Sequence, residues 1–100
     1  MFKSLFSIRK KKKDKHPHIV VGGNRTSFKS IGITHSKKHG RRNNIKLKNN
    51  PNPKDPRQAY ANKQVIQDFK FKYSKAFKNY KLSNEDIDEL IEFLNKKKRK

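Results

Sequence analysis

Two short apolar runs in the first third of the chain carry, at their ends, side chains that can move protons or donate hydrogen bonds. They are two histidines before the first run and three polar residues after the second: His16, His18, Thr34, His35 and Ser36. Cleaving RNA without a metal requires a base for the 2′-hydroxyl, an acid for the leaving 5′-oxygen and donors for the phosphate. Histidine suits both proton roles because its ordinary pKa of about 6.5 lies near neutral pH. We predict His16, Thr34 and His35 as catalytic residues, the histidines exchanging protons and the hydroxyl donating.

Each of these residues also has a plainer interpretation. A histidine in a basic, polar sequence is often an ordinary surface residue, and Thr34 suits a strand by its β propensity alone. The four histidines could instead hold zinc, but the chain has no cysteine and the surrounding lysines and arginines oppose a cation. Gly22-Gly23 lacks the spacing of a nucleotide-binding turn. We therefore predict no metal site and no cofactor.

Two adjacent strands would position these side chains. The runs Ile19–Val21 and Ile31–Ile33 are β-branched, and Gly22-Gly23-Asn24 between them is typical of a turn. The sequence predicts a hairpin or two neighbouring strands, with the polar residues at one end.

A basic loop, 37–42, follows the second strand directly. Cations beside a polar strand end can hold phosphates over it, although most charge runs are simply solvated. We predict a nucleic-acid-binding set that includes this loop and nearby polar residues: Lys15, Arg25, Ser36, Lys37, Lys38, Arg41 and Arg42.

The net charge indicates the class of partner. The chain has 28 Lys and Arg against 8 Asp and Glu, a formal charge of +20, and residues 1–83 hold 23 of the bases with 3 of the acids. A field of this size attracts polyanions. Single-stranded RNA is the expected partner, with an anionic membrane surface less favoured. The lack of cysteine, of a secretory pattern and of a long apolar run predicts a cytoplasmic protein.

The chain is long enough for one small domain. We predict a flexible basic arm over residues 1–15, a single domain over 16–95 and a basic tail over 96–100. The arm contains Phe2, Leu5, Phe6 and Ile8, so a weak amphipathic membrane anchor is its alternative interpretation.

Most of the remaining elements are short. Residues 44–48 alternate as in a half-exposed strand, the proline-rich segment 49–56 predicts a loop, and 58–61 another short strand. Residues 65–80 fit both a strand and a helical stripe. We predict a strand to about Tyr73 and a short helix over 74–80, with the aromatic residues in the core or, for Phe71 and Tyr73, on a base-stacking surface.

The clearest local pattern predicts a helix over 83–95. Ser83 is a suitable N-cap with Asp86 three residues later, as in a capping box. An apolar stripe of i, i+3, i+4 and i+7 spacing follows at Ile87, Leu90, Ile91 and Leu94. This stripe caps the core or binds a second protein.

The order of these motifs resembles the PemK/MazF-like toxins, which are small endoribonucleases. The similar segments are His16-Pro17-His18-Ile19-Val20-Val21, Gly32-Ile33-Thr34-His35-Ser36, Val65-Ile66-Gln67-Asp68, Lys75–Tyr80 and Leu82-Ser83-Asn84-Glu85-Asp86. Members usually carry Arg before the proline, where this chain has His16.

The resemblance implies an α+β fold, namely a small curved antiparallel β-barrel of the Src-homology type with a short helix and a C-terminal helix. It implies metal-independent cleavage of single-stranded RNA, a homodimer and an antitoxin protein as partner. A non-catalytic basic RNA- or DNA-binding protein, ribosome-associated or encoded by a mobile element, is the alternative that the charge favours.

Overall fold

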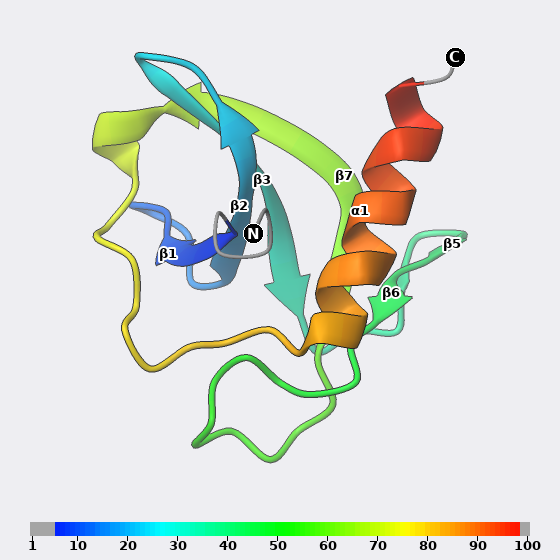
Figure 1. Cartoon of the computed structure of the whole chain (residues 1–100). Helices are drawn as coiled ribbons and strands as arrows, with labels where there is room; N and C mark the ends of the chain where they lie inside the picture. The colour runs from blue at the N-terminus through cyan, green and yellow to red at the C-terminus, as the bar shows by residue number, and fades with distance from the viewer. Residues whose placement is uncertain (1–5, 99–100) are drawn as a thin grey trace.

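The described part of the protein folds as a five-stranded antiparallel sheet with one C-terminal helix, in an α+β arrangement (Figure 1). The computed structural model describes residues 6–98, with side chains as far as Lys96. The sheet has the order β1-β2-β3-β7-β6, and β4 and β5 form a separate two-stranded hairpin. The elements are β1 (Ser7–Lys10), β2 (Pro17–Gly23), β3 (Ser27–Thr34), β4 (Lys38–His39), β5 (Arg42–Asn43), β6 (Ile45–Lys46), β7 (Tyr60–Phe69), the 3₁₀ helix η2 (Lys70–Lys72) and α1 (Asn84–Lys98).

The two predicted apolar strands are confirmed as β2 and β3, paired antiparallel with Ile19 opposite Ile31. Their turn begins at Gly23, whose φ is +150°, and a Cβ there would lie 2.4 Å from the Ser27 carbonyl oxygen, so only glycine fits. The Asn24 side chain accepts hydrogen bonds from the Thr26 and Ser27 amides at 3.0 and 2.9 Å. Register shifts within β2 and β3 interrupt the regular pairing, and such bulges bend a sheet.

The sheet begins before residue 16, within the segment that the sequence predicted as a basic arm. Residues 7–10 form β1, with Ile8 paired to Ile19 and only 3% exposed. The basic run that follows is the connection between β1 and β2 and therefore belongs to the domain. Ile8 joins the core cluster and Phe6, two residues earlier, packs against it, although lysines follow directly. Residues 1–5, which include most of the suggested membrane anchor, lie outside the described residues.

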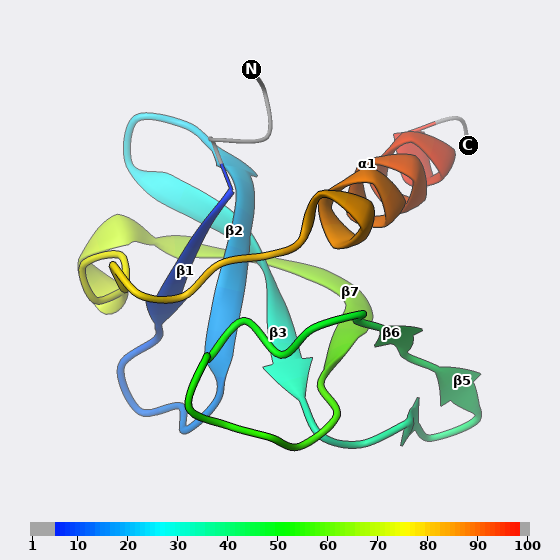
Figure 2. The same cartoon turned by 60° about the horizontal axis from the view of Figure 1, so that its bottom comes forward.

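The segment after β7 also differs from the prediction. β7 ends at Phe69 instead of near Tyr73, and residues 74–80 form no helix. The chain turns through η2 and runs along the outer edge of β1, as Figure 2 shows. Its backbone bonds to β1 and the residues after it: Lys12 N–H to Lys72 O, Ser74 N–H to Lys10 O and Phe77 N–H to Ile8 O, at 2.7–2.9 Å. These bonds use the free edge of β1 and keep the segment extended, which overrides its helical spacing.

The core lies between the curved sheet and α1. Isoleucines of β1, β2, β3 and β6 and the leucine after β6 meet two alanines of the β7 region and one helix residue: Ile8, Ile19, Ile31, Ile33, Ile45, Leu47, Ala59, Ala61 and Leu90. The predicted strand over 44–48 shortens to β6, and the proline-rich segment is a loop as predicted. In the part of the chain that the structure describes, no helix is both long and apolar enough to cross a membrane.

Helix α1 is capped as predicted, because the Ser83 hydroxyl accepts the Asp86 amide at 3.1 Å. The Asp86 carboxylate does not complete a capping box. It is 3% exposed and accepts the backbone amides of Lys48 and Asn49 at 2.7 and 3.3 Å, which ties the helix start to the chain after β6. The helix continues to Lys98, so the first residues of the predicted basic tail belong to it, and residues 99–100 lie outside the described part.

Candidate functional site

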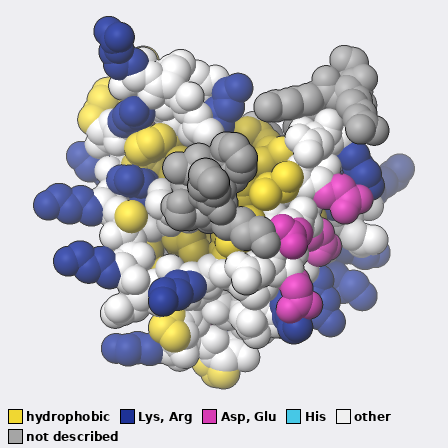
Figure 3. All heavy atoms as spheres, viewed as in Figure 1, with side chains coloured by type: hydrophobic (Ala, Val, Ile, Leu, Met, Phe, Trp, Pro, Cys, Tyr) yellow, Lys and Arg dark blue, Asp and Glu magenta, His cyan; other side chains and the backbone are white. Residues whose placement is uncertain are grey.

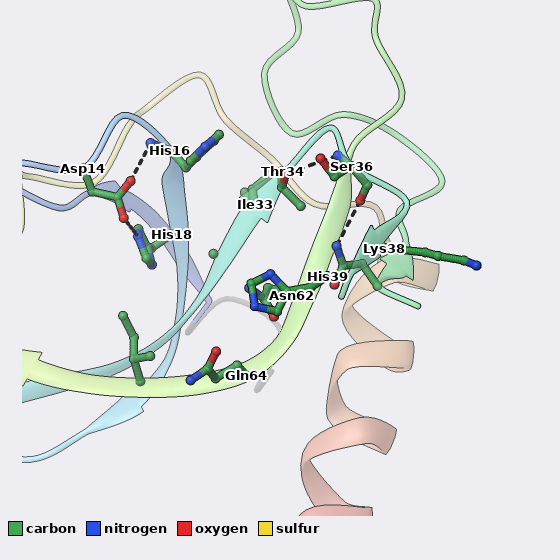
Figure 4. A pocket seen from close by; sticks show the side chains of 13 residues that line it. Asp14, His16, His18, Ile33, Thr34, Ser36, Lys38, His39, Asn62 and Gln64 are labelled. Atoms are coloured by element: carbon green, nitrogen blue, oxygen red, sulfur yellow. Dashed lines mark hydrogen bonds and ion pairs between the residues drawn. The ribbon is translucent and has the colours of Figure 1, made fainter. Parts of the chain in front are cut away.

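A cavity of about 320 Å³ opens where β2 begins and β3 ends, with the middle of β7 and the β4–β5 hairpin around it (Figure 4). Its polar lining contains two exposed imidazoles, two hydroxyls, an ammonium and a carboxylate: His16, His39, Thr34, Ser36, Lys38 and Asp14. Side chains from four separate segments thus face one space. The antiparallel pairing of β2 with β3 brings the start of one strand beside the end of the other.

His16 is placed by a short turn before β2. The Asp14 carboxylate accepts the His16 backbone amide at 3.0 Å, and Pro17 then opens the strand. The imidazole of His16 is exposed and lies on the cavity wall. This predicted catalytic residue therefore has access to a ligand in the cavity.

His18 is buried and belongs to a chain of hydrogen bonds. Its Nε2 lies 2.8 Å from Asp14 Oδ2, and its Nδ1 lies 3.4 Å from Ser30 Oγ. Ser30 Oγ lies in turn 2.9 Å from the Tyr73 hydroxyl. Because Ser30 and Tyr73 are buried, this chain of hydrogen bonds runs inward from the cavity. His18 also lines the cavity wall, and its ring positions the Asp14 carboxylate.

The environment of Asp14 favours the charged carboxylate. Burial alone raises the pKa of Asp14, but hydrogen bonds from the His16 amide and the His18 ring outweigh burial and leave that pKa below its usual value. The cavity therefore has a fixed negative charge at its β2 side.

Thr34 and Ser36 bring hydroxyl groups to the end of β3. Thr34 Oγ1 accepts the Ser36 backbone amide at 3.2 Å, which shapes the turn after the strand. The Ser36 carbonyl accepts the Asn44 side-chain amide at 2.9 Å, which joins this turn to the start of β6. Thr34 and His16 both line the cavity, as the sequence predicted for two residues at neighbouring strand ends.

His35, the third predicted catalytic residue, does not line this cavity. Its Nε2 lies 2.9 Å from Asp55 Oδ2 in the proline-rich loop. Arg57 binds the same carboxylate, and its hydrogen bonds, with a smaller contribution from His35, hold the pKa of Asp55 far below the usual range. Adjacent residues of an extended chain point to opposite sides, so Thr34 faces the cavity and His35 faces the loop.

The predicted nucleic-acid-binding residues divide into three groups. Ser36 and Lys38 line the cavity, with Lys38 extending outward at its rim in Figure 4. Four cations are exposed in segments next to the lining: Lys15, Lys37, Arg41 and Arg42. Arg25 lies in the β2–β3 turn, at the opposite end of these strands from His16.

Six polar lining residues were absent from the predicted catalytic and nucleic-acid-binding sets: Asp14, His18, His39, Asn44, Asn62 and Gln64. His39 lines the cavity because β4 and β5 fold back as a hairpin. Strands of two residues are too short to give a recognisable sequence pattern. Asn62 and Gln64 alternate along β7, and this spacing places them on one face. The alternation is present in the sequence, but the predicted strand begins at residue 65 and therefore excludes both residues.

Comparisons with known proteins add no family assignment. No family model, no curated protein and no solved structure matches the chain. The resemblance to toxin-type ribonucleases therefore stays a prediction from short motifs, and the function is inferred from the residues of the cavity and the charge around it.

Proposed function

We propose that the protein binds single-stranded RNA and cleaves it, without a metal, in the cavity at the end of β2 and β3. The observation that carries this proposal is the convergence of His16, Thr34 and Lys38 on one cavity together with a second exposed imidazole, His39. Two imidazoles, a hydroxyl and an ammonium are the groups that phosphodiester transesterification needs. The order of motifs in this chain resembles that of the toxin-type endoribonucleases, which perform this class of reaction.

The proposed step uses the 2′-hydroxyl of the RNA as the nucleophile. One imidazole, in its neutral form, takes the 2′-hydroxyl proton as the oxygen attacks the adjacent phosphorus. The other imidazole, in its protonated form, gives a proton to the departing 5′-oxygen. The products are a 2′,3′-cyclic phosphate and a 5′-hydroxyl. Thr34 and Lys38 stabilise the added negative charge on the phosphate.

The charge around the cavity supports a polyanionic substrate. All three acids of residues 1–83 bind basic side chains: Asp14 with His18, Asp55 with Arg57 and Asp68 with Lys11. The acidic side chains visible in Figure 3 gather over α1, whereas Lys and Arg lie along both edges of the molecule. The sheet surface therefore attracts phosphates.

The finer features implied by the toxin resemblance belong to the same proposal. The described strands form an open sheet, and we take the bonds between β1 and residues 72–77, with the Lys11–Tyr73 bridge, as the contact that completes a small barrel of the Src-homology type. A homodimer, an antitoxin protein that neutralises the basic surface and a cytoplasmic location are proposed with it.

A non-catalytic RNA- or DNA-binding protein is the second candidate, favoured by the spread of the charge. Exposed cations also lie away from the cavity, such as Arg25 in the β2–β3 turn at the opposite end of these strands. A catalyst with one site does not require them, whereas a protein that coats nucleic acid does.

Single-turnover incubation of a short unpaired RNA, and of DNA of the same sequence, distinguishes these candidates. We expect the RNA to be cut to cyclic phosphate ends with EDTA present, and the DNA to be bound but intact because it lacks the 2′-hydroxyl. RNA that is bound and never cut would establish the non-catalytic candidate. Cleavage that EDTA abolishes would contradict the metal-independent mechanism.

A further inference from the structure

Two phenylalanine rings lie on the surface at the junction of β7 and η2. Phe69 is 53% exposed and Phe71 is 68% exposed. The two rings stack on each other, with centroids 5.5 Å apart and planes at 11°. Exposed single apolar residues are common, but two large rings held parallel in solvent form a defined apolar face.

The backbone around these rings is held by hydrogen bonds. In η2 the Tyr73 amide bonds to the Lys70 carbonyl at 3.0 Å, and the Lys12 amide bonds to the Lys72 carbonyl at 2.7 Å. Tyr73 itself turns inward, where it is 7% exposed and contacts the Phe28 ring edge to face. With Tyr73 fixed in the core, Phe71 is directed outward.

Lysines surround this face. Phe71 borders a hollow of about 530 Å³ whose rim carries Lys11, Lys12, Lys13 and Lys72. Asp68 also lines the hollow and binds Lys11 at 2.8 Å and Lys72 at 3.4 Å. Four ammonium groups against the carboxylates Asp68 and Asp14 leave the hollow positively charged.

Lys13 stands in a backbone conformation that favours glycine, with φ at 69°. A side chain there costs free energy that glycine would avoid. The sequence nevertheless presents a lysine at this point of the β1–β2 connection, beside Phe71.

The hollow and the candidate cleavage cavity share a wall. Asp14 lines both of them, with Phe71 on one side and His16 on the other. A strand of RNA lying over Asp14 would therefore contact the rings and the cavity with neighbouring nucleotides.

We propose that Phe71, backed by Phe69, stacks on an unpaired nucleobase, while Lys12, Lys13 and Lys72 bind the flanking phosphates. This inference rests on the proposed RNA-binding function and extends its site beyond the cavity. Aromatic stacking is tolerant of sequence and gives single-stranded nucleic acid an advantage over duplex. An anionic membrane would also suit rings beside cations, but it gives no reason for the face to adjoin the cavity, so it is retained as an outcome of the test.

A tryptophan at position 71 reports the contact directly, because the chain has no tryptophan of its own. In Phe71→Trp, we expect unpaired RNA to quench the indole fluorescence at the concentrations where it binds. Inorganic polyphosphate, which has charge without bases, should bind without comparable quenching. Quenching equal to that of polyphosphate would overturn the stacking proposal. Emission that shifts with anionic lipid vesicles and not with RNA would assign the face to a membrane.

Affinity measurements on unlabelled variants complete the test. Phe71→Ala should weaken binding of unpaired RNA by about tenfold and leave polyphosphate binding unchanged. Lys13→Gly should weaken the binding of both RNA and polyphosphate more than Lys54→Gly does, which is a matched loss of charge in the proline-rich loop. Lys13→Gly should not lower the melting temperature. If the wild type binds RNA and Phe71→Ala binds it equally, this inference fails and the proposed function stands. If the wild type binds no RNA, the proposed function fails first.

Discussion

Asp68 illustrates how single residues hold the basic strands together. Its carboxylate accepts the Lys11 ammonium and the Phe69 amide, both at 2.8 Å, and links the β1–β2 connection to the end of β7. The Lys11 hydrogen bond is the largest cause that lowers the pKa of Asp68 to about 2 from an ordinary 3.8. The charged form is therefore favoured in the folded protein.

The sign of this shift predicts an acid-sensitive contribution to stability. A carboxylate whose pKa is lowered by folding stabilises the fold at pH values above its pKa in the unfolded chain. This stabilisation is lost as pH falls from about 4 through about 2. We expect Asp68→Asn to reduce the loss of stability across that window. Denaturant unfolding of both proteins at several pH values measures it. An unchanged pH dependence would show that the Lys11 contact contributes nothing.

A substitution of Thr34 tests whether the cavity stabilises the negative charge that develops on the phosphate during cleavage. Thr34→Val keeps the shape and removes the hydroxyl, so we expect RNA cleavage to fall by about fivefold, as for one hydrogen bond of about 1 kcal/mol. RNA affinity should be nearly unchanged. Rates and affinities measured on the same RNA separate these effects, and an equal fall in affinity would assign Thr34 to binding.

At the scale of elements, α1 is attached to the sheet through Asp86. The buried carboxylate binds two backbone amides after β6, and hydrogen bonds to a charged group contribute about 1.5–3 kcal/mol. Asp86→Ala should lower the free energy of unfolding by about 2–3 kcal/mol. Glu89→Gln, on an exposed position of the same helix, is the matched control and should have little effect. Equal effects of the two variants would show that helix charge, not the amide contacts, is responsible.

The apolar stripe of α1 contributes to the core chiefly through Leu90, which is 0% exposed. Leu90→Ala should cost about 2–4 kcal/mol of unfolding free energy. Leu94→Ala, one turn later and only half-buried, should cost less. Denaturant melts compare them, and an unchanged midpoint for Leu90→Ala would mean that the stripe faces a partner instead of the core.

The elements that the sequence predicted best are those whose local signals agree. β2 and β3 have β-branched residues, turn chemistry and polar ends, and α1 has a cap and a stripe. Residues 74–80 were mispredicted because their spacing suits a helix, whereas the free edge of β1 demands hydrogen bonds that only an extended chain supplies. The sequence placed His16 and Thr34 together because they lie at the ends of two predicted neighbouring strands. The β4–β5 hairpin, which places His39 in the cavity lining, has no strong sequence pattern.

For the whole molecule, the excess of positive charge predicts salt-sensitive binding. If about six phosphates are contacted, the logarithm of the association constant for unpaired RNA should fall with the logarithm of salt concentration at a slope of about −4. Titrations of labelled RNA at several salt concentrations measure the slope. A slope near zero would exclude nucleic acid as the principal partner.

The central claim is that the cavity beside His16 cleaves the RNA that this surface binds. Its most direct test is the single-turnover cleavage rate of wild type, His16→Ala and His35→Ala on one unpaired RNA, with the affinity of each measured in parallel. We predict that His16→Ala lowers the rate by about 10²-fold or more with affinity nearly unchanged. His35→Ala, whose ring is bound to Asp55 outside the cavity, should cleave at close to the wild-type rate. Equal rates for wild type and His16→Ala, or a loss confined to His35→Ala, would contradict the assignment of the reaction to this cavity.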